Sequence, residues 1–466
     1  MTAVILVADG ARPDTLAAAI DAGQLPALSA LRRDGASHVV TSVFPSVTGP
    51  AYVPFLMGLH PGEAGIPGIR WWDRAGTRVY ANGNARSYVG FEALRQDGDL
   101  TAAHPTLFEL ARRPLAALTP IGRGLRDGER LGAGIASWPR MAWTHFRGDT
   151  RGWLRLEAAL ADRVAARVAT GAHDLVLFAH QCIDKFSHLR GHDAPEVLAA
   201  MRGVDAMVAR LRDDAARTGR PLDLIVVSDH GHSPVQAHLD LADLVRARGH
   251  GVLAHPWTFA GGDDVAVMGS GNAMAHLYLE LGRRERPWWP ALARRWGSLV
   301  AELGAHPAVD LLLLPRGPEA CEVRSAARGG ALVRRTQRGG LRYEPIDGDP
   351  LELASALDAS GSLGGEAGLD ADAAYDATRA TTYPDALVQV LALAGSPRAG
   401  EIIVSAAPGW DLRSRWEPIP HRSTHGSLRR EHLLVPLLTS FVPDRVPRRT
   451  ADVFRLARQG MATTRA

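Results

Sequence analysis

Short apolar runs separated by amphipathic segments dominate the hydrophobic pattern of this chain. Four runs end in polar residues, and they cover residues 3–10, 173–184, 222–232 and 401–412. Such runs are typical of strands that are buried on both faces of a parallel sheet. An amphipathic helix is predicted between them at 194–219, ending on a glycine as many helices do. Alternating strands and helices predict an α/β fold, with a doubly wound, mostly parallel sheet flanked by helices.

Two other parts of the chain have a different pattern. Residues 75–150 are rich in Arg, Gly and Pro and show no clear central strand, which indicates an insertion. Residues 257–400 contain a Trp-rich helix, a further apolar run and a hairpin pattern, with an exposed loop expected at 355–376. We therefore predict a catalytic core at 1–256 and 401–466, and a smaller α+β cap insertion at 257–400.

Composition and charge are those of an ordinary globular protein. Apolar residues make up 46% and charged residues 22% of the 466 positions, and the formal net charge is +3. Without a run of like charges, we expect no binding to nucleic-acid polymers. Two cysteines, Cys182 and Cys321, cannot form a disulfide framework. Since we find no signal peptide and no apolar run of membrane-spanning length, we expect a cytoplasmic protein.

Polar residues gather where the predicted strands end, and this is the main clue to function. In doubly wound folds, functional groups collect beyond the carboxyl ends of the strands. Three carboxylates, three imidazoles and one hydroxyl occupy such positions: Asp9, Asp184, Asp229, His188, His230, His425 and Thr48. Three Asp and three His suffice for two three-ligand sites that suit Zn²⁺ and, less selectively, Mn²⁺ or Fe. Two such cations about 4 Å apart can serve phosphoryl transfer.

Thr48 has two interpretations. It stands in “FPSVTGPAYVPFLMGLHPGEAGIPG” (44–68), ahead of an apolar helical pattern, where threonine is a common N-cap. Alternatively, a metal ion activates its hydroxyl as a nucleophile. Each candidate ligand, taken alone, also has a structural interpretation. Asp9 before Gly10 fits an ordinary turn, and His188 alone fits a surface histidine. The whole set in this order favours the metal-site interpretation.

The order Asp, Thr, Asp-x-x-x-His, Asp-His, His resembles the alkaline phosphatase superfamily, and most of all its type I phosphodiesterase / nucleotide pyrophosphatase branch. The matching strings are “DGARPD” (9–14), “PSVTGPAYVPFLMGLHPGEAGIPG” (45–68), “DKFSH” (184–188), “SDHGH” (228–232) and “THGS” (424–427). The resemblance implies an alkaline-phosphatase-like core with two divalent metal ions. No cysteine stands in a C-x-P-x-R setting, which disfavours a sulfatase.

The resemblance also implies a role for each candidate residue. One metal ion would be held by Asp184, His188 and His425. The other would be held by Asp9, Asp229 and His230, with Thr48 beside it as the nucleophile. A covalent phospho-enzyme would form on that threonine, and water would then hydrolyse it.

The chain departs from the pattern of the branch just after Thr48. “TGPAYV” replaces “TFPNHY”, and the Asn that follows the “GI-x-G” turn and donates to the phosphate is replaced by Ile69 and Arg70. Arg70 is a candidate phosphate clamp, or else it packs on Trp71 and Trp72. The two tryptophans either stack on a flat group of the substrate or pack in the core or at its rim, and packing is the favoured alternative.

Four further polar residues lie close to the motifs. Asn272, before an apolar strand pattern, is a candidate phosphate or substrate contact. Glu431 and His432 either orient the His425 imidazole or are solvated charges at a helix start. His232 next to the Asp-His pair is similarly open.

Three functions are consistent with these residues. The first is a phosphodiesterase or nucleotide pyrophosphatase that hydrolyses a small organophosphate. The alternative is a phosphomonoesterase or a C–P hydrolase like the phosphonoacetate hydrolases, for which Arg70 and Lys185 supply added cationic groups. A non-catalytic binding protein is disfavoured, because loss of catalysis usually removes the need for a full ligand set. The sequence predicts neither the leaving group nor the oligomeric state.

Overall fold

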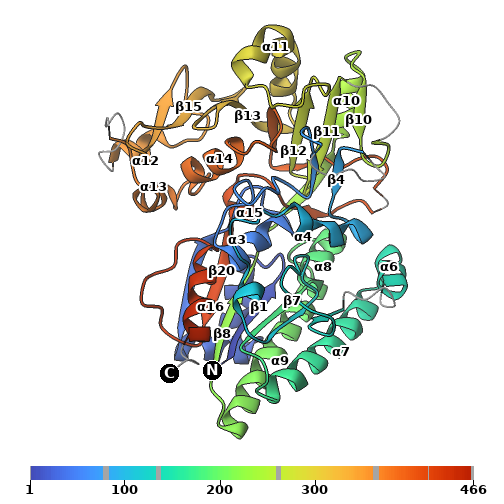
Figure 1. Ribbon diagram of the computed structural model, residues 1–466, viewed down its shortest axis with the longest axis vertical. Helices are drawn as coiled ribbons and strands as arrows, with labels where there is room; N and C mark the ends of the chain where they lie inside the picture. Colours follow the sequence, from blue (N-terminus) through green and yellow to red (C-terminus); the bar gives the residue numbers. More distant parts are fainter. Residues whose placement is uncertain are drawn as a thin grey trace.

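A seven-stranded sheet forms the centre of the computed structural model (Figure 1), which describes residues 2–76, 83–132, 138–258, 264–359, 367–417 and 419–462. Five neighbouring strands run parallel, and β20 runs antiparallel to both of its neighbours. In spatial order the strands are β2 (Ala36–Thr41), β20 (Leu434–Thr439), β8 (Leu222–Val227), β1 (Thr2–Ala8), β7 (Leu175–His180), β5 (Pro114–Ala117) and β6 (Arg130–Leu131). The predicted α/β class with a mostly parallel sheet is confirmed.

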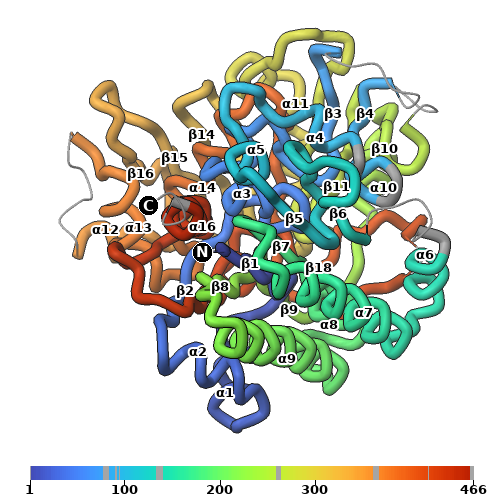
Figure 2. Tube along the Cα trace, turned by 60° about the horizontal axis from the view of Figure 1, so that its bottom comes forward, coloured from blue at the N-terminus to red at the C-terminus, as the bar shows by residue number. Residues whose placement is uncertain are grey.

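Helices cover both faces of this sheet. Every residue of β1 is buried, as a central strand between two helical layers requires. Figure 2 shows α3 and α16 on one side of the sheet and α1, α2, α7 and α9 on the other. The helices of this part are α1 (Pro13–Asp21), α2 (Pro26–Asp34), α3 (Val53–Met57), α4 (Gln96–Asp99), α5 (Leu107–Leu110), α6 (Trp138–Phe146), α7 (Thr150–Ala169), α8 (Cys182–Arg190), α9 (Pro195–Thr218), α15 (Arg430–Leu433) and α16 (Asp452–Ala462), with the 3-10 turns η1 (Pro50–Tyr52) and η2 (Gly90–Arg95).

A second, eight-stranded sheet lies beyond the carboxyl edge of the first (Figure 1). Ile402 and Val404 pack in the cluster around α11, whereas Ile403 between them packs in the cluster around α14. This alternation follows from the two-residue period of a strand and places one helix on each face. The strands in order are β10 (Val252–Ala254), β11 (Val265–Ser270), β12 (Met274–Leu279), β17 (Ile402–Ala406), β13 (Val309–Gly317), β14 (Ala320–Ser325), β15 (Gly329–Arg335) and β16 (Leu341–Pro345).

In the described part of the chain, the remaining elements are five helices of the second part and two small sheets. The helices of the second part are α10 (Leu241–Arg246), α11 (Trp289–Ala305), α12 (Ala354–Ala359), α13 (Ala371–Thr378) and α14 (Ala386–Ala394). Two small sheets contain β18 (Gly409–Asp411), β9 (Ser233–His238) and β19 (Ser423–Thr424) in one case, and β3 (Arg70–Trp72) and β4 (Ala85–Ser87) in the other. Among the described residues, no helix combines the length and the apolar character that a membrane crossing needs.

Three expectations from the sequence are wrong. Residues 401–412 supply β17 of the second sheet, in antiparallel pairing, and not a strand of the parallel sheet. Residues 75–150 do contain central-sheet strands, since β5 pairs with β7 and β6 pairs with β5. The expected loop at 355–376 includes most of α12 and α13, while residues 360–366 lie outside the described part.

Candidate active site

The carboxyl edge of the central sheet carries a cluster of acidic and histidine side chains. β1, β7 and β8 are parallel neighbours, so their carboxyl ends lie together. Asp9 directly follows β1, and Asp229 and His230 follow β8. Helix α8 follows β7 and carries Asp184 and His188. The topology of the sheet therefore brings together residues that are far apart in the sequence.

Asp184, His188 and His425, the first ligand set predicted from the sequence, lie close together. Asp184 and His188 are one helical turn apart on α8, which places both side chains on one face. Asp184 Oδ1 lies 3.3 Å from His188 Nε2 and 3.5 Å from His425 Nε2, and the two Nε2 atoms are 3.2 Å apart. Three donor atoms that converge in this way suit a divalent cation.

Asp9, Asp229 and His230, the second ligand set predicted from the sequence, also lie close together. His230 Nε2 lies 3.5 Å from Asp9 Oδ1 and 3.5 Å from Asp229 Oδ2. All three side chains are buried, and Asp229 Oδ2 has no hydrogen-bond partner within the described part of the chain. An unpaired buried carboxylate oxygen is costly, and a bound cation would satisfy it. His230 Nε2 is 3.9 Å from Asp184 Oδ1, so the two sets adjoin.

The hydroxyl of Thr48 faces the second ligand set. It donates to Asp9 Oδ1 at 3.3 Å, and its oxygen lies 3.2 Å from His230 Nε2. The N-cap interpretation is wrong, because Gly49 occupies the N-cap position of η1 and no side chain caps that turn. The Tyr52 hydroxyl donates to Asp9 Oδ2 at 3.4 Å and so helps to fix this carboxylate.

Main-chain carbonyl groups orient the three candidate histidine ligands. A ring that donates its Nδ1–H to a carbonyl presents a lone pair at Nε2, the form that binds a metal ion. In each ring Nδ1 lies near such an oxygen: His188 at Ser423 (2.8 Å), His425 at Ser46 (2.8 Å) and His230 at Gly231 (3.1 Å). All three rings therefore direct Nε2 toward the centre of the cluster.

Electrostatics favour a cation at this place. Burial, and then the charges of Asp229 and Asp184, raise the pKa of Asp9 well above its usual range. Burial likewise raises the pKa of Asp229 and lowers that of His425, which keeps this imidazole neutral. Burial also opposes the ionisation of Asp184, but His188 and the other imidazoles outweigh it and lower its pKa. A divalent cation would stabilise the carboxylates in their charged form. The cluster can thus hold divalent metal ions.

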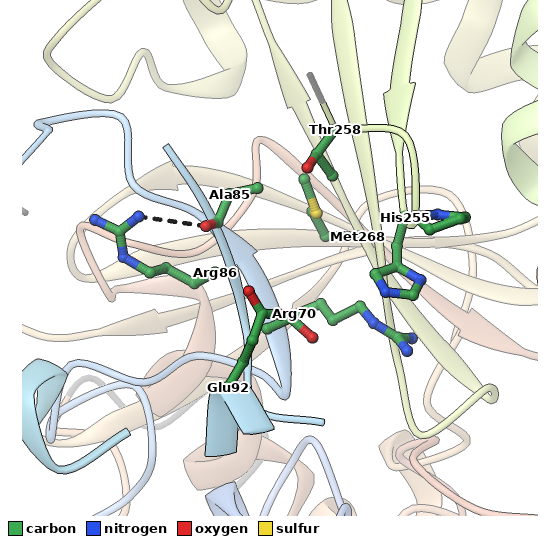
Figure 3. A pocket seen from close by; sticks show the side chains of 9 residues that line it. Arg70, Ala85, Arg86, Glu92, His255, Thr258 and Met268 are labelled. Atoms are coloured by element: carbon green, nitrogen blue, oxygen red, sulfur yellow. Dashed lines mark hydrogen bonds between the residues drawn. The ribbon is translucent and has the colours of Figure 1, made fainter. Parts of the chain in front are cut away.

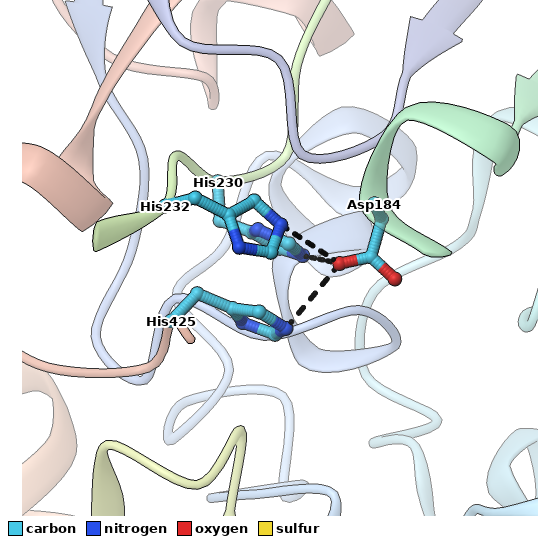
Figure 4. A group of neighbouring side chains, drawn as sticks. All are labelled: Asp184, His230, His232 and His425. Carbon is cyan, nitrogen blue, oxygen red and sulfur yellow. Dashed lines mark hydrogen bonds and ion pairs between the residues drawn. The ribbon is translucent and has the colours of Figure 1, made fainter. Parts of the chain in front are cut away.

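His232 belongs to the cluster, although the sequence left its role open. Its Nε2 lies 3.0 Å from Asp184 Oδ1 (Figure 4). Its Nδ1 lies 3.2 Å from the Ser423 hydroxyl. Asp184, His230, His232 and His425 offer donor atoms within 4.8 Å of one another. Burial lowers the pKa of His232 to about 3, so this imidazole is neutral beside Asp184. The feature of the sequence that could indicate its place in the cluster is its position two residues after His230.

Arg70 lines two hollows beside the second sheet. The larger, of about 120 Å³, is also lined by His255 (Figure 3). Within the described residues Arg70 Nε has no hydrogen-bond partner, and Arg70 Nη1 lies 3.7 Å from Glu417 Oε1. Glu417 Oε2 accepts a hydrogen bond of 2.7 Å from Asn272 Nδ2, and the backbone of Asn272 forms a bridge with that of His425. A chain of contacts thus connects Arg70 to the first ligand set.

The other candidate residues, His432, Glu431, Trp71 and Trp72, make contacts with other groups of the protein. His432 is buried and bonded to two serine side chains, so neither the solvated interpretation nor direct orientation of His425 holds for it. Glu431 lies 3.4 Å from Arg429. Trp71 and Trp72 are buried and belong to the main core.

Comparison with known proteins places this site in a family. The family model described as type I phosphodiesterase / nucleotide pyrophosphatase matches residues 3–286, which include every candidate ligand except His425. Since the match covers more than half of the chain, the protein belongs to this family. Family membership and the ligand cluster together indicate a hydrolase of phosphoester type with a group of side chains that could hold divalent metal ions.

Two solved structures share the fold along almost the whole chain. Phosphonoacetate hydrolase from Sinorhizobium meliloti 1021, in complex with phosphonoformate, is 18% identical with a TM-score of 0.56, covering 99% of this chain and 96% of its own. Murine ectonucleotide pyrophosphatase / phosphodiesterase 5, in an inactive form in complex with AMP, is 14% identical with a TM-score of 0.56, covering 99% and 95%. No curated protein sequence matches the chain.

Proposed function

We propose that the protein is a phosphodiesterase or nucleotide-pyrophosphatase-like hydrolase that acts through Thr48. The observation that carries this proposal is the position of the Thr48 hydroxyl, 3.3 Å from Asp9 Oδ1 and 3.2 Å from His230 Nε2. A threonine hydroxyl is a weak nucleophile by itself, and it needs a base or a metal ion beside it. Two residues of the second ligand set stand where such activation would occur.

The ligand sets would hold two divalent metal ions, with Zn²⁺ the first candidate and Mn²⁺ or Fe the alternatives. When bound, these ions would lower the pKa of the hydroxyl and offset the charge of the phosphoryl oxygens. Asp9 and His230 hold the Thr48 hydroxyl in place, its proton passes to solvent, and its oxygen attacks phosphorus. The bond from phosphorus to the leaving group breaks, and the leaving oxygen takes a proton from solvent. Water then cleaves the threonine phosphoester and restores the hydroxyl.

Arg70 favours a second candidate function. Its side chain is largely buried, with 13% exposed, and its Nη1 lies 3.7 Å from Glu417 Oε1. A buried guanidinium with unused donors is suited to an additional anionic group on the substrate. A phosphomonoester or a phosphonate carries more negative charge than a diester, so this residue supports the monoesterase or C–P hydrolase alternative. Asn272, which donates to Glu417, stays a predicted substrate contact on the same side.

A substrate panel tests these proposals. Bound metal is measured first, and bis-p-nitrophenyl phosphate, p-nitrophenyl phosphate and thymidine 5′-monophosphate p-nitrophenyl ester are then assayed in parallel. Preference for the two diesters supports the first candidate, whereas dominant hydrolysis of p-nitrophenyl phosphate supports the second. A protein with no bound metal and no turnover of any of the three would refute both. Thr48→Ala should abolish turnover and keep the metal, and full activity of this variant would exclude Thr48 as the nucleophile.

A further inference from the structure

The side chain of Gln96 is buried without a hydrogen-bond partner. Gln96 is the first residue of α4 and has no exposed surface. Within the described part of the chain, neither Oε1 nor Nε2 of its carboxamide finds a partner. Buried polar groups are nearly always paired, because leaving them unpaired costs free energy on folding. An unpaired carboxamide in a folded protein therefore points to a ligand that is absent when the site is empty.

This carboxamide lies against the turn that carries Thr48. A Cβ atom built on Gly49 would stand 3.3 Å from Gln96 Oε1 and 3.5 Å from Nε2, and no other residue comes as near. Gly49 has φ of +99°, a conformation that favours glycine, and it follows Thr48 directly. The absence of a side chain at position 49 thus leaves room for the Gln96 carboxamide against the residue that follows the candidate nucleophile.

Two main-chain donors of the same turn are unused as well. Among the described residues, the backbone N–H groups of Thr48 and Gly49 donate no hydrogen bond, although their neighbours Val47 and Ala51 do. The Thr48 hydroxyl itself is engaged with Asp9. The turn therefore combines an oriented hydroxyl with unused backbone N–H groups and an adjacent carboxamide that also has an N–H to give.

We propose that Gln96 donates its Nε2–H to a phosphoryl oxygen of the substrate while Thr48 attacks phosphorus. This inference rests on the proposed function. A phosphoryl group in transfer carries charge on its non-bridging oxygens, and donors fixed in advance at those oxygens stabilise the transition state. The carboxamide presents either end after rotation by half a turn, so Nε2 can face the ligand. Gln96 is then a catalytic residue that recognises a tetrahedral phosphate or phosphonate group.

Two substitutions at Gln96 test this inference in the metal-loaded protein. Gln96→Met keeps the length of the side chain and removes both polar atoms, and Gln96→Glu places a carboxylate at the same position. The readouts are kcat and KM for the best substrate of the panel, inhibition by orthovanadate, metal content and Tm. Gln236→Met, on an exposed glutamine of β9, is the matched control.

We expect Gln96→Met to lower kcat/KM and to weaken orthovanadate inhibition, each by about 10- to 100-fold. Its metal content should match the wild type and its Tm should not fall, because the variant removes an unpaired buried amide. Gln96→Glu should lose more, since a carboxylate repels the phosphoryl oxygens, and Gln236→Met should behave as the wild type.

Wild-type kcat/KM and orthovanadate inhibition in Gln96→Met would overturn the inference. So would a loss of activity that only follows a lower Tm or a loss of metal, because that result assigns Gln96 to packing. The proposed function fails differently, through full activity of Thr48→Ala or an inactive wild type. An inactive wild type overturns both proposals.

Discussion

Gly10 lies between the two ligand sets, and its replacement by alanine should damage both. Its N–H donates to Asp229 Oδ1 at 3.2 Å, and its φ is +77°. A Cβ atom at this position would stand 2.8 Å from His232 Nε2 and 3.0 Å from both Cα and Cβ of Asp184. Because Asp184 Cα belongs to the backbone of α8, no side-chain rotation removes this clash.

The cost of Gly10→Ala has two parts. An alanine in the left-handed region costs about 1–2 kcal/mol. Forcing an additional carbon atom into a packed site costs about 1–3 kcal/mol more. The free energy of unfolding should therefore fall by about 2–5 kcal/mol, and the displacement of Asp184 should lower metal content and activity.

Gly23→Ala is the matched control for this prediction. Gly23 has a similar φ of +71°, but a Cβ atom there would meet nothing within 4 Å. This variant should carry only the conformational cost of about 1–2 kcal/mol and keep its metal and activity. Denaturant unfolding, metal analysis and the hydrolysis assay are applied to both variants in parallel. If Gly10→Ala loses no more than Gly23→Ala and retains metal and activity, the placement of Asp184 and His232 around Gly10 is refuted.

Three further predictions concern single side chains. His232→Ala removes the neighbour of Asp184 and should weaken metal affinity by about 10- to 100-fold in chelator competition, and an unchanged affinity would contradict its role in the cluster. Glu401→Ala leaves Arg74 (2.8 Å) and Arg286 (4.0 Å) buried without their shared carboxylate, and should lower the free energy of unfolding by about 3–5 kcal/mol. In denaturant unfolding, a loss below about 1 kcal/mol would argue against this cost. Arg70→Gln should lower kcat/KM for p-nitrophenyl phosphate about tenfold more than for the diester substrates, and an equal loss for all would exclude charge recognition by Arg70.

Much of the site could be predicted because its residues follow strands that the sequence identifies. Apolar runs long enough for β1, β7 and β8 are each followed by ligand-type residues, and parallel pairing brings their ends together. The spacing of Asp184 and His188 likewise predicts that both lie on one face of a helix, as they do on α8. At these positions the local sequence pattern and the topology of the sheet give the same arrangement, so the meeting of these side chains at one edge of the sheet can be predicted.

Other parts of the fold depend on contacts that a local pattern does not contain. An apolar run indicates a buried strand but not the sheet to which it belongs, so the run at 401–412 predicts a strand of the parallel sheet, whereas β17 lies in the second sheet. β5 is four residues long and begins with Pro114, and β6 has two residues, so neither gives a readable period. Gln96 begins the helix α4, which has only four residues and gives no readable period, and only its burial against Gly49 draws attention to it.

The most direct test of the account is to trap the covalent intermediate at Thr48. The metal-loaded enzyme is quenched with acid during turnover, digested, and its peptides are analysed by mass spectrometry. The account predicts a phosphoryl adduct on Thr48 whose amount rises and falls with turnover and which is absent in Thr48→Ala. Steady turnover with no adduct at Thr48, or an adduct on another residue, would contradict it.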